Sequence, residues 1–190
     1  MKRPHVSARS TAVGFLAASV FATSPASAGW IDEGKVGILA HDVGIFGDNV
    51  ESGADVDGEL IFKSPSFLKM IGSPRQDVGV SVNTDNKTSF LYLDILNWEW
   101  APVHNLLHPG DGAYVDAFLG GAVHDGNLNH EDNGKKALGT RALYHLGASL
   151  GYQINPVNSV EVYFVHLSNA GASSHNGGIN DIGIRVGFKF

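Results

Sequence analysis

The chain has 190 residues, with 13 Lys and Arg against 19 Asp and Glu, and it contains no cysteine. The excess of acidic residues argues against nucleic acid as a partner, because that affinity depends on neutralising phosphates. The lack of Cys excludes disulfides, thiol catalysis and Cys-ligated metal sites.

The first 28 residues predict a cleaved signal peptide. A start containing three Lys and Arg is followed by an apolar stretch over residues 11–22, too short to cross a bilayer as a helix, and by an Ala-Ser-Ala cleavage site at 26–28. We expect cleavage after Ala28. This leaves one domain over residues 29–190 with ten Lys and Arg against 19 Asp and Glu, a net charge of −9. An N-terminal anchor that is not removed is the alternative.

The rest of the chain alternates short apolar runs with turn residues and shows little helical periodicity. Turn signals such as Asp85-Asn86 and the Asn-Pro-Val-Asn sequence at 155–158 separate the apolar runs. This pattern predicts eight β-strands. They are Val36–Phe46, Ala54–Lys63, Asp77–Asn83, Ser89–Trp100, Ala113–His124, Ala142–Ile154, Ser159–Ser168 and Ile179–Phe190.

The last predicted strand bears on the choice between two all-β folds, a soluble β-sandwich and a membrane barrel. Its even positions from Ile182 to Phe190 are apolar, and its odd positions include Asp181, Arg185 and Lys189. Such alternation fits a soluble β-sandwich or a strand of a membrane barrel. The even number of strands and the predicted export favour an eight-stranded antiparallel transmembrane β-barrel with up-and-down topology. The terminal Phe190 agrees with this, because it resembles the C-terminal signature of bacterial outer-membrane proteins.

A barrel of this size restricts where chemistry can occur. Eight strands leave no water-filled pore, so side chains fill the interior, and we expect Glu161 to pair there with Arg185 or Lys189. Trp98 and Trp100 are candidates for an aromatic belt at the membrane interface. With both termini in the periplasm, the loops expected on the cell surface are 47–53, 84–88, 125–141 and 169–178.

The segment 64–76 does not fit a short periplasmic turn. It is long for such a turn, and it contains the apolar sequence Phe-Leu-Lys-Met-Ile at 67–71. A short helix within this segment is our interpretation.

His166 and Ser168 are the candidate catalytic residues. They lie two positions apart in the seventh strand, so both point to the face that also carries Val162 and Phe164, the lipid-facing side. A hydroxyl beside an imidazole is the minimum for nucleophilic acyl transfer, because the imidazole can accept the hydroxyl proton. Taken alone, the pair also fits ordinary polar residues at the end of a strand.

The sequence around this pair is more specific than the pair itself. It reads His-Leu-Ser-Asn-Ala-Gly at 166–171, continues with Asn-Gly-Gly at 176–178, and ends in the alternating strand with its terminal Phe. This segment resembles the PagL family of lipid A 3-O-deacylases, and the sequences at 63–67 and 72–75 also look like members of that family. The resemblance implies an eight-stranded barrel with its active site on the outer wall, and a serine-hydrolase mechanism without a metal or other cofactor.

The resemblance also assigns roles to individual residues. It implies that Ser168 is the nucleophile and His166 the general base. Asn169 and the backbone N–H groups around Ala170 and Gly171 become candidates for stabilising the oxyanion, as preorganised hydrogen-bond donors do.

The third catalytic residue departs from the family pattern, because the position of the typical Glu is occupied by Asn180. Asn180 can orient the imidazole as a neutral acceptor, as the Asn of Cys-His-Asn proteases does. The alternative is the adjacent Asp181, which shares the lumenal register of Arg185 and needs a bulge at Gly177-Gly178 to reach the other face. Replacing the Asp of a Ser-His-Asp enzyme with Asn costs about 10⁴ in turnover. A catalytically inactive barrel is therefore an open alternative.

Other polar residues are interpreted as structural. The His residues of two loops, His104 with His108 and His124 with His130, lack the spacing of metal ligands on a defined element. Lys135, Lys136 and Arg141 in loop 125–141 are candidates to bind lipid A phosphates, with solvated loop charges as the simpler interpretation.

We therefore expect an outer-membrane hydrolase that removes an ester-linked acyl chain from lipid A, and the resemblance suggests the 3-O chain. The expected partners are lipid A or lipopolysaccharide in the outer leaflet and the membrane itself, and a homodimer is allowed. No nucleic acid, metal or cofactor is expected. The alternatives are an inactive barrel with a structural or adhesion role and a soluble periplasmic β-sandwich that binds a ligand.

Overall fold

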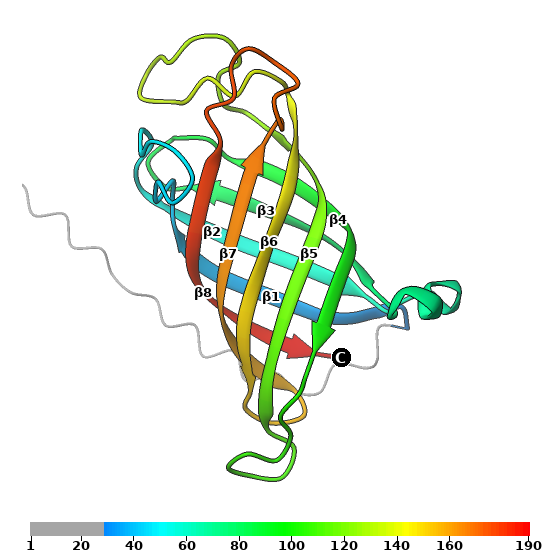
Figure 1. Ribbon diagram of the computed structural model, residues 1–190. Coiled ribbons are helices and arrows are strands. Elements are labelled where there is room, and N and C mark those ends of the chain that lie inside the picture. The colour runs from blue at the N-terminus through cyan, green and yellow to red at the C-terminus, as the bar shows by residue number, and fades with distance from the viewer. Residues whose placement is uncertain (1–28) are drawn as a thin grey trace, which may run out of the picture.

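The computed structural model describes residues 29–190, so the predicted signal peptide lies outside the described residues. The chain forms a closed barrel in which each strand pairs antiparallel with its sequence neighbours and the first strand pairs with the last (Figure 1). This confirms the predicted fold. The strands are β1 (Ile31–Ala40), β2 (Ala54–Phe62), β3 (Arg75–Asn83), β4 (Phe90–Trp100), β5 (Gly112–His124), β6 (Ala142–Gln153), β7 (Asn158–Ser168) and β8 (Ile179–Lys189).

Seven strands lie within two residues of their predicted bounds, and β1 does not. The predicted strand Val36–Phe46 began too late, because Glu33 and Lys35 belong to β1 and are buried inside the barrel. Because these buried positions carry polar residues, the first half of β1 shows no alternation of apolar residues in the sequence. The predicted end was also wrong, since β1 stops at Ala40 and the backbone turns at Asp42 with a left-handed φ of 51°.

The barrel wall is apolar outside and polar inside. On β8, for example, Ile184 is 61% exposed while its neighbour Arg185 is 2% exposed. A barrel that spans a membrane needs an apolar outer surface of this kind where it meets hydrocarbon. It also needs a closed sheet, because an open edge would leave backbone groups without hydrogen bonds.

Charged side chains fill the lumen in pairs. The Nε atom of Arg185 donates to Glu161 at 2.7 Å, which confirms the predicted pairing. The Nζ atom of Lys35 donates to Glu161 at 2.8 Å and to Asp116 at 2.9 Å. Removing one member of such a buried pair costs about 3–5 kcal/mol of stability, because the partner is left as an uncompensated charge. The sealed lumen leaves the outer wall and the loops for chemistry.

The connections at the two ends of the barrel differ. Loops 41–53, 84–89, 125–141 and 169–178 gather at one end, which is the upper end in Figure 1. The opposite end carries the C-terminus and the β2–β3 connection, where the expected short helix is present as the 3-10 helix η1 (Ser66–Ile71). Among the described residues, no helix has the length and apolar character needed to cross a membrane.

Candidate active site

Three predicted residues come together on the outer wall, near the end that carries the long loops. His166 and Ser168 lie on β7 and are both half-buried, on the same face as the exposed Val162. Asn180 lies on β8 directly opposite His166 in the strand register. Antiparallel residues that face each other have Cβ atoms about 4.5–5.5 Å apart, so the pairing brings the imidazole and the carboxamide into contact.

A hydrogen bond joins these two side chains. The Nδ1 atom of His166 lies 2.7 Å from the Oδ1 atom of Asn180. Since Oδ1 can only accept, Nδ1 carries the proton and Nε2 is left unprotonated in the neutral imidazole. This is the tautomer that a general base needs, because Nε2 can then take a proton from a hydroxyl.

The Asn180 carboxamide is held in this orientation by loop 41–53. Its Nδ2 atom donates to the backbone carbonyl of Phe46 at 3.4 Å, so Oδ1 faces the imidazole. The backbone carbonyl of Asn180 accepts a hydrogen bond from the N–H of Val43 at 2.7 Å. Loop 41–53 therefore fixes both the main chain and the side chain of the residue that orients His166.

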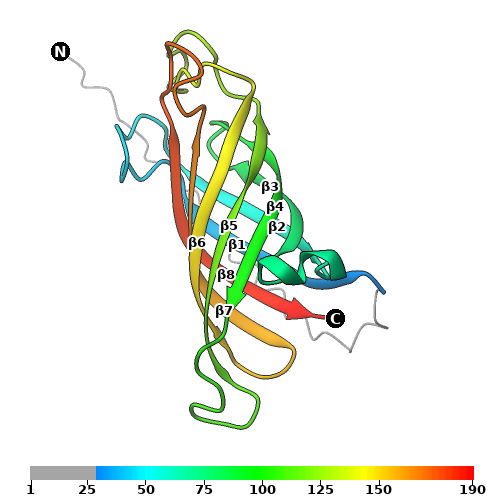
Figure 2. The same ribbon diagram turned by 45° about the vertical axis from the view of Figure 1, so that its right-hand side comes forward.

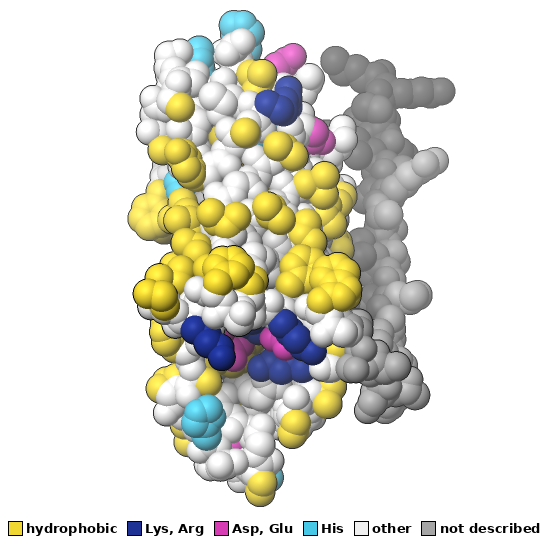
Figure 3. Space-filling model, turned by 90° about the vertical axis from the view of Figure 1, so that its right-hand side faces the viewer, with side chains coloured by type: hydrophobic (Ala, Val, Ile, Leu, Met, Phe, Trp, Pro, Cys, Tyr) yellow, Lys and Arg dark blue, Asp and Glu magenta, His cyan; other side chains and the backbone are white. Residues whose placement is uncertain are grey.

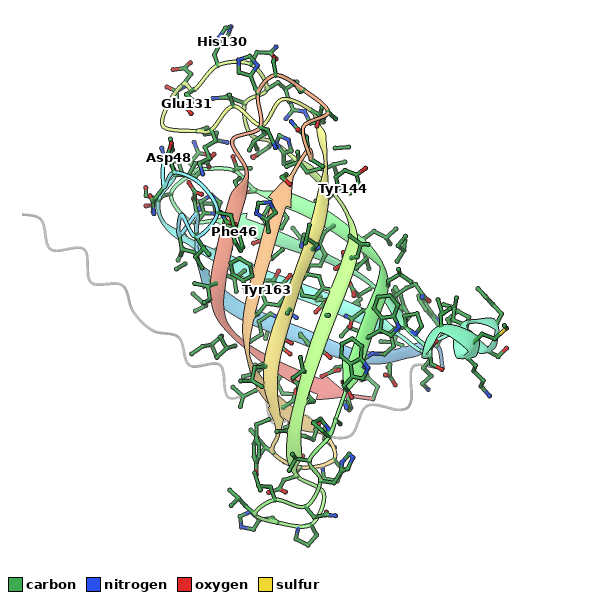
Figure 4. The ribbon with its side chains drawn as sticks, viewed as in Figure 1. Phe46, Asp48, His130, Glu131, Tyr144 and Tyr163 are labelled. Atoms are coloured by element: carbon green, nitrogen blue, oxygen red, sulfur yellow. The ribbon has the colours of Figure 1, made fainter. Side chains whose placement is uncertain are left out.

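The ring of Phe46 covers part of the same site. It lies edge-on to the His166 imidazole, with ring centroids 5.8 Å apart, and edge-on to Phe164 at 6.0 Å. Phe46 is nevertheless 64% exposed, and Figure 4 shows it at the outer side of the wall. Phe46 was predicted to lie inside the first strand, and its contact with His166 was not predicted, because its position depends on the path of the whole loop.

Ser168 lies beside a groove on the outer wall. Its partner on β6 is Tyr144, which is 54% exposed, and Tyr144 is in turn paired with Gly121 on β5. The Ser168 hydroxyl makes no hydrogen bond within residues 29–190, so it can turn toward the imidazole or a substrate. The groove has a volume of about 460 Å³ and is lined by Gly120, Gly121, Thr140, Ala142, Leu143, Tyr144, Asn169 and Ala172.

Asp181, the alternative third residue, lies on the other face of the sheet. Its Oδ1 atom accepts a hydrogen bond from the Asp42 N–H at 2.8 Å and lies 3.3 Å from Nδ1 of His41. The carboxylate is fully buried in the lumen. No bulge interrupts the register between β7 and β8 near Gly178, so Asp181 stays on the face opposite His166.

Asn169 is not free to bind a substrate oxygen through its side chain. Its Nδ2 atom donates to the backbone carbonyls of Leu138 at 2.9 Å and His175 at 2.6 Å, and its Oδ1 atom accepts from the N–H of Gly171. The expected role as an oxyanion donor therefore conflicts with its role in shaping the loop. The N–H of Ala170, which has a left-handed φ of 52°, makes no hydrogen bond within the described part of the chain.

A buried polar cluster ties the surface loops to the active site. The Nζ atom of Lys136 donates to Asp42 at 2.7 Å and to the carbonyl of Gly178 at 2.8 Å. A Cβ atom on Gly178 would lie 3.4 Å from Cε1 of His166, so Lys136 holds the backbone that borders the imidazole. Lys136 is only 1% exposed, and the interpretation of this residue as a solvated or phosphate-binding loop charge is wrong.

Glu51 occupies the centre of this cluster. Its carboxylate accepts hydrogen bonds from the backbone N–H groups of Thr88 and Lys136, both at 2.7 Å, and lies 3.2 Å from Nε2 of His41. Burial raises the pKa of Glu51, but these hydrogen bonds outweigh burial and lower it to about 2. One carboxylate thus joins three of the four loops.

Two buried clusters of the described residues combine side chains that can bind metals. One is His41, Asp55 and Asp181, and the other is Glu59, Asp77 and Asp94. Both lie in the lumen, on the opposite face of the sheet from His166 and Ser168. They are separate from the candidate active site.

Comparison with known proteins identifies the family. The profile described as "Lipid A 3-O-deacylase (PagL)" matches residues 74–189, which is more than half of the chain and includes His166, Ser168 and Asn180. The chain belongs to this family. Membership in the PagL family, together with the closed barrel, makes the chain an outer-membrane protein of the lipid A deacylase class. No protein of curated function matches the chain.

One solved structure supports the same fold. The crystal structure of the outer membrane enzyme PagL is 18% identical, with a TM-score of 0.59 over 82% of this chain and 97% of that chain. The N-terminal β-barrel domain of OprF from Pseudomonas aeruginosa is 14% identical, with a TM-score of 0.48 over 84% of this chain and 98% of that chain. At this identity the PagL structure bears on the barrel fold alone.

Proposed function

We propose that this PagL-family protein hydrolyses an ester-linked acyl chain of lipid A, at the 3-O position, with Ser168 as the nucleophile and His166 as the general base. The hydrogen bond from His166 Nδ1 to Asn180 Oδ1 carries this proposal, because it leaves Nε2 unprotonated on the side of the wall that holds Ser168. The substrate and the catalytic pair then share the outer leaflet of the membrane.

The reaction proceeds through an acyl-enzyme. His166 Nε2 takes the proton as Ser168 Oγ attacks the ester carbonyl, and the imidazolium returns that proton to the departing glucosamine oxygen. Water then attacks the acyl-serine with His166 again as the base, which releases the fatty acid and restores the hydroxyl. The backbone N–H of Ala170 is the proposed oxyanion donor, since the Asn169 carboxamide and the Gly171 N–H are bound within the loop.

The groove beside Ser168 is the proposed path of the acyl chain. Ser168, Tyr144 and Gly121 face one another across β7, β6 and β5. At a strand spacing of about 4.8 Å, the row extends roughly 10 Å sideways from the nucleophile. Gly121 has no left-handed φ, and a Cβ atom there would meet only the Leu143 carbonyl at 3.6 Å. The fold does not require glycine at this position, and a glycine within a strand can mark a place where a ligand approaches closely.

One observation favours a second candidate, a catalytically inactive barrel. Asn180 is neutral where the family typically has Glu, and it cannot stabilise an imidazolium as a carboxylate does. Such a barrel would have a structural or adhesion role instead of turning over lipid A.

Mass spectrometry of lipid A separates the two candidates. Cells producing the wild-type chain should lose one ester-linked acyl chain from lipid A, and cells producing Ser168→Ala at equal outer-membrane levels should not. Ser173→Ala, in the loop that follows, is the matched control and should behave as wild type. Identical acylation of lipid A with wild type and Ser168→Ala would reject the hydrolase.

A further inference from the structure

The β2–β3 connection exposes apolar side chains that the barrel does not cover. No residue of η1 is buried; Phe67 is 74% exposed and Met70 is 95% exposed. Side chains of this kind gain free energy when they leave water, so a cluster of them on a surface marks a contact. The candidate active site does not account for this segment.

The helix is held in a fixed place against the wall. Nε1 of Trp98 on β4 donates to the carbonyl of Ile71 at 2.8 Å. Gly72 ends the helix with a left-handed φ of 90°, and a Cβ atom there would lie 3.4 Å from the Trp98 ring. Figures 1 and 2 show that η1 projects sideways from the barrel and does not extend along its axis.

The exposed apolar side chains of η1 continue the lipid-facing wall. Trp98 and Trp100 stack with ring centroids 6.4 Å apart, and Trp30 stacks on Phe62 at 4.8 Å near the same end of the barrel. Figure 3 shows a broad group of apolar side chains on this face, with Lys and Arg side chains directly below it and Asp and Glu side chains between them. Aromatic side chains gather at the boundary between hydrocarbon and headgroups in membrane barrels.

The charges in this segment have one sign. Lys63 and Lys69 are exposed, and residues 63–74 contain no Asp or Glu. Apolar side chains flanked by lysines are the composition of interfacial segments that bind anionic lipid surfaces. A second copy of this chain would bring the same positive charges together.

From these observations we infer that η1 and Trp98 form an interfacial anchor in the periplasmic leaflet of the outer membrane. Phe67, Met70 and Ile71 enter the acyl region, and Lys63 and Lys69 bind the anionic headgroups of glycerophospholipids. The anchor fixes the depth of the barrel in the membrane. This role is independent of the proposed hydrolysis.

Site-specific fluorescence tests the anchor directly, because the chain has no cysteine to interfere with labelling. Met70→Cys carries an environment-sensitive fluorophore, and the barrel, purified from outer membranes, is reconstituted in vesicles with brominated acyl chains. Ile184→Cys on the outer wall is the control for lipid contact, and His130→Cys in the surface loop is the control for water. Heat-modifiable gel migration confirms that each labelled variant is folded.

We expect bromine quenching at position 70 to approach that at position 184 and to exceed that at position 130 severalfold. Quenching at position 70 equal to that at position 130 would overturn the anchor. Unlabelled Met70→Cys that still forms disulfide-linked dimers when it is oxidised at a high lipid-to-protein ratio would assign the surface to a second copy and would also overturn the anchor.

Vesicle composition tests the headgroup contact. Adding phosphatidylglycerol to phosphatidylcholine vesicles should shift the position-70 emission to shorter wavelength, and Lys63→Gln with Lys69→Gln should remove this shift. An equal shift in the charge-neutral variant would reject the role of the two lysines.

Discussion

The imidazole of His166 and the carboxamide of Asn180 meet at 2.7 Å across two neighbouring strands, on the outer wall of the barrel. A neutral acceptor fixes the tautomer of the imidazole but does not compensate its positive charge after it takes a proton. For the proposed hydrolysis, this pair therefore sets the position of the imidazole proton but supplies no counter-charge to an imidazolium.

Replacing Asn180 with Glu should raise the turnover of lipid A. A carboxylate stabilises the imidazolium; the reverse change in a Ser-His-Asp enzyme costs about 10⁴, largely through the wrong tautomer. Because Asn180 already sets the tautomer here, we expect a gain of roughly 10- to 100-fold in kcat. The measurement is the rate of fatty-acid release from lipid A in mixed micelles. Asn180→Asp controls for side-chain length, and Asn180→Ala should lower the rate; a rate below wild type for both acidic variants would contradict the assigned position.

Removal of the Phe46 ring should weaken catalysis without unfolding the barrel. The edge-on contact with His166 belongs to a class of aromatic pairs that contribute about 0.5–1.5 kcal/mol. Phe46→Ala should therefore lower kcat/KM by roughly 2- to 12-fold. Ile45→Ala is the matched control, because Ile45 is a similarly exposed apolar residue of the same loop, at 53%. Equal losses in the two variants would show that the loop acts through general apolar contact with lipid.

Loss of the Lys136 charge should disorder the surface loops while the barrel persists. Lys136→Met leaves the Asp42 carboxylate buried without its cation, at a cost of about 3–5 kcal/mol, and releases the carbonyl of Gly178 beside the imidazole. We expect faster proteolysis of loop 125–141, a large loss of activity, and unchanged heat-modifiable migration. The double variant Lys136→Met with Asp42→Asn should recover loop stability in part. Full activity of Lys136→Met would show that the loop cluster does not position the site.

The sequence indicated the strands and the outward placement of His166 and Ser168 more readily than the loop architecture. Glu161 and Arg185 were predictable as partners, because they lie on neighbouring strands and alternation points both side chains into the lumen. Lys136 was not predictable. A lysine next to a second lysine in a long loop has the pattern of a solvated charge. Only the convergence of loops 41–53, 125–141 and 169–178 buries it. The position of Phe46 was not predictable either, because it depends on the path of loop 41–53 beside β7 and β8.

The buried polar cluster of the loops, which contains His41, Asp42, Glu51 and Lys136, should be most stable between about pH 4.5 and 6.5. Burial lowers the pKa of His41, but its bonds to Asp181, Asp55 and Glu51 outweigh burial and raise it to about 12, so its contribution to stability is complete below about 6.5 and declines as pH rises toward 12. The pKa of Glu51 is lowered to about 2, so its contribution is complete above about 4.5 and is lost as pH falls toward 2.

Limited proteolysis of loop 41–53 across this range measures the effect. Cleavage should be slowest within the window and should accelerate on both sides. His41→Gln should remove the alkaline limb and leave the acidic limb in place; an unchanged alkaline limb in this variant would assign it to another group.

A side chain at position 121 should change which acyl chains the enzyme accepts. Gly121→Leu fills the groove roughly 10 Å from Ser168, at about two strand spacings, without a clash at Cβ. A long acyl chain would then have to shift its ester carbonyl, and a displacement of about 1 Å costs on the order of 100-fold in rate. We expect that loss for long-chain substrates and near wild-type rates for short-chain esters, measured on synthetic glucosamine esters of graded length.

Gly58→Leu, at an equally open outward-facing position on β2, is the matched control and should leave both rates unchanged. Because the short-chain rate reports on Ser168 and His166 separately from the groove, equal losses at every chain length would reject the acyl path while leaving the catalytic pair intact.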